Sequence, residues 1–147
     1  MSDVPNQSKV EYSQLEVGYE FPPAHYQLDA STVSAYLQAV EETHQLFQGS
    51  ALVPPMAVAA LTMASLSEHL TFPAGAIHVS QDFEFTDTVT TGDTLTSHAS
   101  VARKQDRGKL HLLAIDLNVN NLEGKTVLTG KTSFVLPDSS AQAETPG

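Results

Sequence analysis

The sequence predicts an α+β fold in which a curled antiparallel β-sheet is wrapped around one apolar helix. Two observations lead to this prediction. Residues 51–66, ALVPPMAVAALTMASL, hold no charge, so a helix there has no polar face to turn toward water. After residue 75 the pattern changes to alternating apolar and polar residues, which is typical of half-buried strands. A sheet and a water-avoiding helix can bury each other's apolar surface.

The N-terminal part predicts a short strand followed by a helix. HYQLD (25–29) alternates, and ASTVSAYLQAVEETHQLF (30–47) follows with apolar residues at helical spacing. Asp29 or Ser31 can cap the start of this helix through a side-chain oxygen. A Gly-Ser pair at 49–50 ends it. One face of this helix is therefore expected to pack inward.

The second helix begins at a pair of prolines. Pro54 and Pro55 fit the first turn of a helix, where a missing N–H removes no hydrogen bond. Residues 56–70 are apolar or small nearly all round, which predicts burial on most sides. The free amide donors at this helix start are then expected at Met56, Ala57 and Val58.

Four long alternating segments complete the pattern. They are rich in Thr, Val, Leu and Ile, and turns that contain glycine separate them. The segments are residues 76–89, 93–105, 109–121 and 125–137. Consecutive strands with short turns predict an antiparallel meander, and the apolar helix lies across one of its faces. This arrangement is the hot-dog fold.

Length and composition predict one domain. The chain has 147 residues and is 41% hydrophobic. We expect a flexible N-terminus over residues 1–12, a single domain over 13–137 and a disordered tail over 138–147. The sequence has no cysteine, no signal-peptide pattern and no apolar stretch long enough to span a membrane. A cytoplasmic protein that does not bind membranes is expected.

The charge balance argues against a nucleic-acid-binding protein. The net charge is −10, and seven Lys and Arg residues cannot form a large basic surface. Four of those seven lie between residues 103 and 109. Within that group, Arg103 and Lys104 are candidates for binding a small anionic group of a substrate. A charged hairpin tip without a ligand is the alternative.

Four segments, taken in order, carry a resemblance to a known family. They read HYQLDASTVSAYLQAVEE, VPPMAVAALTMASL, GAIHVSQDFEFTDTVTTGDTLTSHASV and LNVNNLEGKTVLTGKTSFVLP. They resemble MaoC-like acyl dehydratases and (R)-specific enoyl-CoA hydratases, with the dehydratase N-terminal type as the nearest variant. The resemblance implies a hot-dog domain that dimerises edge to edge and binds an acyl-CoA or another acyl thioester. It also implies reversible hydration of an enoyl thioester, with coenzyme A as part of the substrate and no separate cofactor.

The catalytic pattern of that family, Asp-x-Asn-Pro-x-His before the central helix, is altered in this chain. The corresponding stretch, residues 41–47, has no Asn-Pro and a shorter spacing between acid and histidine. Two alternatives to a hydratase therefore stay open. One is a non-catalytic subunit that shapes the acyl tunnel of a partner hydratase, and the other is a thioesterase on the same fold. Exposed sheet edges favour a homodimer, with a heteromer containing an active hot-dog subunit as the alternative.

His44 is the candidate general base, and Glu41 or Glu42 is its candidate acidic partner. If the first helix continues that far, His44 shares the apolar face with Val33 and Leu37. Glu41 then lies at the edge of this face and Glu42 on the opposite one, so Glu41 is the better partner. The alternative is a histidine that complements the helix dipole beside a surface acid.

Hydration also needs a donor for the charge that develops on the thioester oxygen. The amides of Met56, Ala57 and Val58 are candidates, because a helix N-terminus carries the positive end of the dipole. Tight packing of small residues is the alternative. His78, in the first long strand, is a further candidate for substrate binding. No two histidines have a metal-ligand spacing, so no metal is expected.

Overall fold

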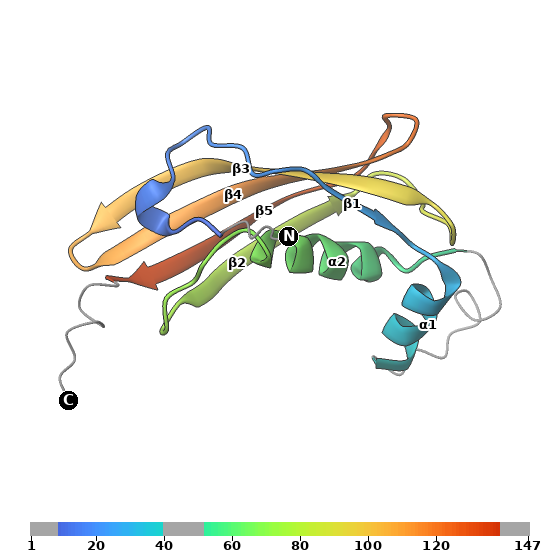
Figure 1. The fold of residues 1–147 in the computed structure, drawn as a ribbon, viewed down its shortest axis with the longest axis horizontal. Helices are drawn as coiled ribbons and strands as arrows, with labels where there is room; N and C mark the ends of the chain where they lie inside the picture. The colour runs from blue at the N-terminus through green and yellow to red at the C-terminus, as the bar shows by residue number, and fades with distance from the viewer. Residues whose placement is uncertain (1–8, 40–51, 139–147) are drawn as a thin grey trace, which may run out of the picture.

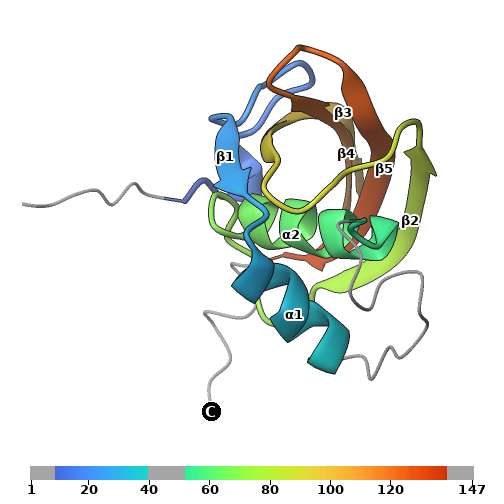
Figure 2. The ribbon, with the colours of Figure 1, turned by 90° about the vertical axis from the view of Figure 1, so that its right-hand side faces the viewer.

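The structure, a computed structural model, describes residues 9–39 and 52–138. Five strands form one antiparallel sheet, and two α-helices and a 3-10 turn accompany it in this part of the chain. The elements are η1 (Tyr12–Gln14), β1 (Ala24–Gln27), α1 (Ala30–Ala39), α2 (Pro55–Ser67), β2 (Ile77–Phe85), β3 (Thr94–Arg107), β4 (Leu110–Asn121) and β5 (Thr126–Pro137). The predicted architecture is confirmed, because the strands curl around α2 (Figures 1 and 2).

The strand order corrects the predicted meander. Hairpins join β3, β4 and β5, but β2 lies beyond β5, and the order is β1-β3-β4-β5-β2. Residues 86–93 therefore cross the end of the sheet instead of forming a hairpin. The turn predicted at Gly92 exists, with a φ of 99°, but it ends this crossover. A turn signal shows that the chain reverses direction, and it does not show which strand pairs with which.

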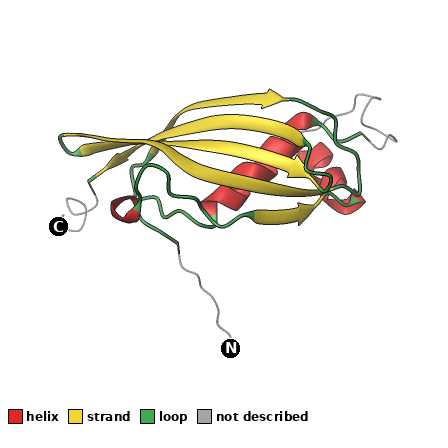
Figure 3. Cartoon of the chain, turned by 90° about the horizontal axis from the view of Figure 1, so that it is seen from above, coloured by secondary structure: helices red, strands yellow, loops and turns green. Residues whose placement is uncertain are grey.

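The sheet covers one side of α2 (Figure 3). The buried residues of this helix are Ala57, Val58, Ala59, Thr62 and Leu66. Its other side is open in the single chain, since Met56 is 52% exposed and Ala60 and Ala64 are exposed too. The predicted burial on most sides is therefore not reached within one chain. None of the helices in the described ranges is long and apolar enough to cross a bilayer.

One polar pair lies in the core between α2 and β1. Thr62 is only 2% exposed, and its hydroxyl donates to the carbonyl of Val58 at 2.8 Å. The hydroxyl of Tyr26 lies 2.9 Å from the same Thr62 oxygen. Burial raises the pKa of Tyr26, so this phenol stays protonated and donates to Thr62. Both buried polar groups are thereby satisfied.

The strand β2 is an edge of the sheet and pairs with β5 alone. Phe83 is its one half-buried residue, and it packs against both clusters of the core. The rest of the strand is exposed, including Ile77 at 58% and Val79 at 48%. An apolar strand edge of this kind is ready to pair with another chain.

Candidate functional site

A cavity of about 340 Å³ opens beside the start of α2. Three segments form its walls: the start of α2 with the residues before it, the crossover after β2, and the start of β5. The lining residues are Leu52, Val53, Pro55, Val58, Phe85, Thr86, Asp87, Thr88, Val89 and Val127. Most of these side chains are apolar, so the cavity suits a ligand with a hydrocarbon part and few polar groups.

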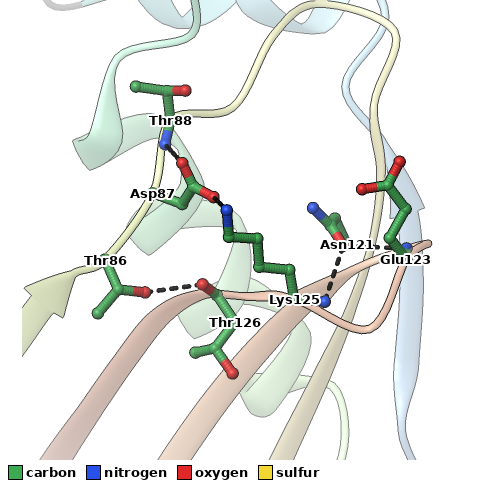
Figure 4. Close-up of polar contacts among 7 residues, drawn as sticks. All are labelled: Thr86, Asp87, Thr88, Asn121, Glu123, Lys125 and Thr126. Carbon is green, nitrogen blue, oxygen red and sulfur yellow. Dashed lines mark hydrogen bonds and ion pairs between the residues drawn. The ribbon is translucent and has the colours of Figure 1, made fainter.

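Asp87 is the ionisable group in this wall. Its carboxylate accepts hydrogen bonds from Lys125 Nζ and from the Thr88 N–H, both at 2.8 Å (Figure 4). The Lys125 ammonium is the main cause, and the Thr88 N–H the second, that hold the pKa of Asp87 below its ordinary value. Asp87 therefore stays ionised at neutral pH. It can orient a donor on a ligand, but it has no proton to give.

The turn between β4 and β5 places Lys125 next to Asp87, which lines the cavity. The side-chain oxygen of Asn121 accepts the N–H groups of Glu123 and Lys125 at 3.0 and 2.9 Å. The Thr86 hydroxyl donates to the carbonyl of Thr126 at 2.8 Å, which ties the crossover to the start of β5. Figure 4 shows how these contacts join the two segments. These local hydrogen bonds thus help to hold the Lys125 ammonium beside the Asp87 carboxylate.

Of the three predicted amide donors at the start of α2, only Met56 keeps a free N–H among the described residues. The Ala57 N–H donates to the Pro54 carbonyl at 2.9 Å, because the helix begins with a tight 3-10-type turn. Val58 comes after the first four positions of the helix start, whose amides lack an acceptor inside a helix, so its own N–H is expected to bond within α2. The Val58 side chain lines the cavity. The Met56 N–H has no acceptor within residues 9–39 and 52–138.

The candidate catalytic residues His44, Glu41 and Glu42 lie outside the described residues. The described chain resumes at Leu52, which is itself in the cavity wall.

His78 lies away from this cavity. Its Nε2 is 2.7 Å from the Thr132 hydroxyl, and its ring stacks on Phe134 with the ring centres 4.9 Å apart. Phe85 lies seven positions after His78 on the same extended strand, so the two are about 20 Å apart. The structure therefore does not bring His78 together with the start of α2.

The structure also separates Arg103 from Lys104. They are consecutive on β3, so their side chains point to opposite faces of the sheet. On the inner face, Lys104 Nζ donates to the carbonyl of Leu15 at 2.7 Å and lies 4.4 Å from the centre of the Tyr12 ring. On the outer face, Arg103 donates to Gln105 Oε1 at 2.6 Å. Both belong to the half of β3 that runs to the β3–β4 hairpin, away from the start of α2 (Figure 1).

A polar cluster at this hairpin has no signal in the sequence. Asp106 Oδ1 accepts a hydrogen bond from the Tyr12 hydroxyl at 2.7 Å and lies 2.8 Å from His111 Nδ1. The Tyr12 hydroxyl, and then His111, lower the pKa of Asp106. Tyr12 and Asp106 are 94 residues apart, so no local pattern pairs them. The wall residue Asp87 has no local signal either, because the sequence predicts one strand over residues 76–89, whereas β2 ends at Phe85.

Known proteins with a similar fold include bacterial (R)-hydratases. The R-hydratase PhaJ1 of Pseudomonas aeruginosa aligns with a TM-score of 0.74 at 21% identity, over 86% of this chain and 85% of that chain. The (R)-hydratase from A. caviae that is involved in PHA biosynthesis aligns with a TM-score of 0.71 at 21% identity, over 84% of this chain and 98% of that one.

A chain of a two-component enzyme is similar as well. The C-terminally truncated HadBC complex of Mycobacterium tuberculosis, a 3R-hydroxyacyl-ACP dehydratase, aligns with a TM-score of 0.66 at 18% identity, over 81% of this chain and 96% of that chain. At such identities these likenesses show the fold, and they confirm the hot-dog prediction.

The sequence itself matches a family model. No curated protein matches this chain in sequence. However, a model described as FAS1-like, dehydratase domain region matches residues 16–130, which is most of the chain. The resemblance to MaoC-like dehydratases is thereby confirmed. The chain belongs to the FAS1-like dehydratase domain family.

Proposed function

We propose that the chain acts on an acyl thioester as a hydratase or dehydratase, with enoyl-CoA as the substrate. The observation that supports this most is the apolar cavity at the start of α2, where an acyl chain fits beside the positive end of a helix dipole. In hydration, the oxygen of water bonds to the β carbon and the α carbon gains a proton. Dehydration is the reverse, with loss of the α proton and of the hydroxyl as water.

The proposed roles follow from what each step needs. In this proposal His44 removes a proton from water and returns one to the α carbon. Glu41 is its proposed acidic partner, and Glu42 is the second choice for the acid. The Met56 N–H donates to the thioester oxygen as negative charge develops there. Asp87 does not supply the proton, because Lys125 keeps it ionised.

We further propose that a second hot-dog unit covers β2. Ile77 and Val79 on this edge and Met56 on the open side of α2 leave apolar surface exposed in the single chain. A second copy pairing edge to edge buries this surface, and a related subunit is the alternative. Light scattering at micromolar concentration tests this. A monomer under all conditions contradicts it.

The assay for the activity uses crotonyl-CoA and the purified chain. Loss of the enoyl absorbance without release of free thiol is the expected result. His44→Ala should lower the rate at least about 100-fold, because general base catalysis contributes that much. His98→Ala, an exposed histidine on the outer face of β3, is the matched control and should keep the rate.

The other outcomes separate the alternatives. Release of thiol indicates a thioesterase. No reaction with the isolated chain, but a reaction after a hot-dog partner is added, indicates a non-catalytic subunit. An unchanged rate in His44→Ala removes this histidine from the mechanism.

A further inference from the structure

A second cavity, of about 370 Å³, lies on the outer face of the sheet near the β3–β4 hairpin. Three neighbouring strands, β3, β4 and β5, supply its walls. The residues that matter for its chemistry are Arg103, Gln105, Arg107, Leu110, Leu112 and Val135. It shares no lining residue with the cavity beside α2, which lies on the inner side of the sheet. A ligand here is therefore not the thioester bound beside α2 in the same chain.

Strand register places apolar side chains on this outer face. Leu112 lies opposite Gln105 on β3 and opposite Val135 on β5. The neighbouring residues Leu113 and Phe134 belong to the buried core, so Leu112 and Val135 point outward. Leu110, which is 51% exposed, extends this apolar floor toward the hairpin. A solvent-facing side of an antiparallel sheet is normally polar, so a floor of this kind is suited to contact with a ligand.

Two guanidinium groups flank the floor. Within residues 9–39 and 52–138, neither Arg103 nor Arg107 has a carboxylate partner, and Arg103 donates to the neutral Gln105 side chain. Arg103 and Arg107 are four residues apart on one strand, so their Cα atoms are about 13 Å apart. Side chains of this length can close on one anionic group from both sides. Inside those two ranges, no ion pair neutralises either arginine, although the chain as a whole carries a net charge of −10.

We propose that this cavity binds an organic anion with an apolar body. Arg103 and Arg107 hold its carboxylate or phosphate through charge-assisted hydrogen bonds. The hydrocarbon part lies on Leu110, Leu112 and Val135. A fatty carboxylate and a phosphate ester of an alkyl chain share this chemistry. This site is additional to the proposed hydration of a thioester and does not depend on it.

Calorimetric titration of the full chain tests the site. The probes are decanoate, decyl phosphate and inorganic phosphate, each at low and at high salt. The decyl compounds should bind, more weakly at high salt, and the stronger one identifies the anionic group. Inorganic phosphate should bind at least about tenfold more weakly, because it makes no contact with the floor.

Substitutions assign the binding to this cavity. Arg103→Gln and Arg107→Gln should each weaken the decyl compounds by about tenfold or more, since each removes a charged donor. Leu112→Ser should weaken the decyl compounds and leave inorganic phosphate unchanged. Lys131→Gln is the matched control, because Lys131 is an exposed cation of β5 outside the cavity and should not affect binding.

Three results would overturn the proposal. The first is no saturable binding of either decyl compound. The second is inorganic phosphate binding as tightly as decyl phosphate, which means that charge alone attracts the anion. The third is binding that survives both arginine substitutions but is lost in Phe85→Ala, which assigns the ligand to the cavity beside α2. Each result is independent of the crotonyl-CoA assay.

Discussion

Gly130→Ala tests how closely β2 packs on β5. A Cβ atom at residue 130 would lie 2.5 Å from Phe83 Cδ1 and 2.6 Å from the Asp82 carbonyl oxygen. Ordinary contact starts at 3.4 Å, so each neighbour must recede by about 0.8–0.9 Å. The phenyl ring can turn, but the carbonyl belongs to the backbone of β2, which is paired with β5 along this stretch. The added methyl group therefore strains the pairing of the two strands.

The expected loss of stability follows from two opposing effects. Overpacking of this kind costs about 1–3 kcal/mol. Replacing glycine stabilises by about 0.4–1 kcal/mol, because the unfolded chain has less conformational freedom to lose. The net prediction is a fall of about 1–2 kcal/mol in the free energy of unfolding. For a chain of this size, it corresponds to roughly 2–8 °C in Tm.

Urea unfolding followed by circular dichroism measures this change. Lys131→Gln is the control on the adjacent exposed position, where the ion pair to Asp116 spans 3.8 Å and contributes little. The reasoning is refuted if Gly130→Ala is as stable as the wild type, or more stable. An equal loss of stability in Gly130→Ala and Lys131→Gln also refutes it, because the effect is then not specific to the close contact at Gly130.

Three further changes have definite expected outcomes. The pKa of Asp106 is lowered in the folded protein, so the ionised Asp106 stabilises the fold above about pH 4. This stabilisation is lost as the pH falls through the folded pKa. Asp106→Asn should therefore reduce the fall in Tm between about pH 5 and pH 3. Thr62→Val leaves the buried Tyr26 hydroxyl without its partner, and urea unfolding should show a loss of about 1–3 kcal/mol. Lys125→Gln should raise the pKa of Asp87 in an NMR titration, while the free energy of unfolding changes by less than about 1 kcal/mol. An unmoved Asp87 titration would contradict the last of these.

The fold was largely predictable because its signals are local. Alternation marks each long strand, and Pro54 marks the start of α2 within a residue. The neighbour of β2 was not predictable, because pairing with β5 arises only when the whole sheet curls around the helix. For the same reason, the residues that form the wall of the cavity beside α2 were not predictable. Asp87 forms an ion pair with Lys125, which lies in a turn far away in the sequence, so no local pattern predicts this contact.

The crossover at residues 86–93 connects the edge strand β2 with the cavity beside α2. It continues directly from β2, whose free edge is the proposed assembly surface, and its first residues are a wall of the cavity beside α2. A subunit that pairs with β2 would thus contact the strand that leads into the wall of the cavity beside α2. If the proposed second subunit pairs with β2, it would therefore also influence the shape of this cavity, and the choice of subunit would then affect which acyl groups fit there.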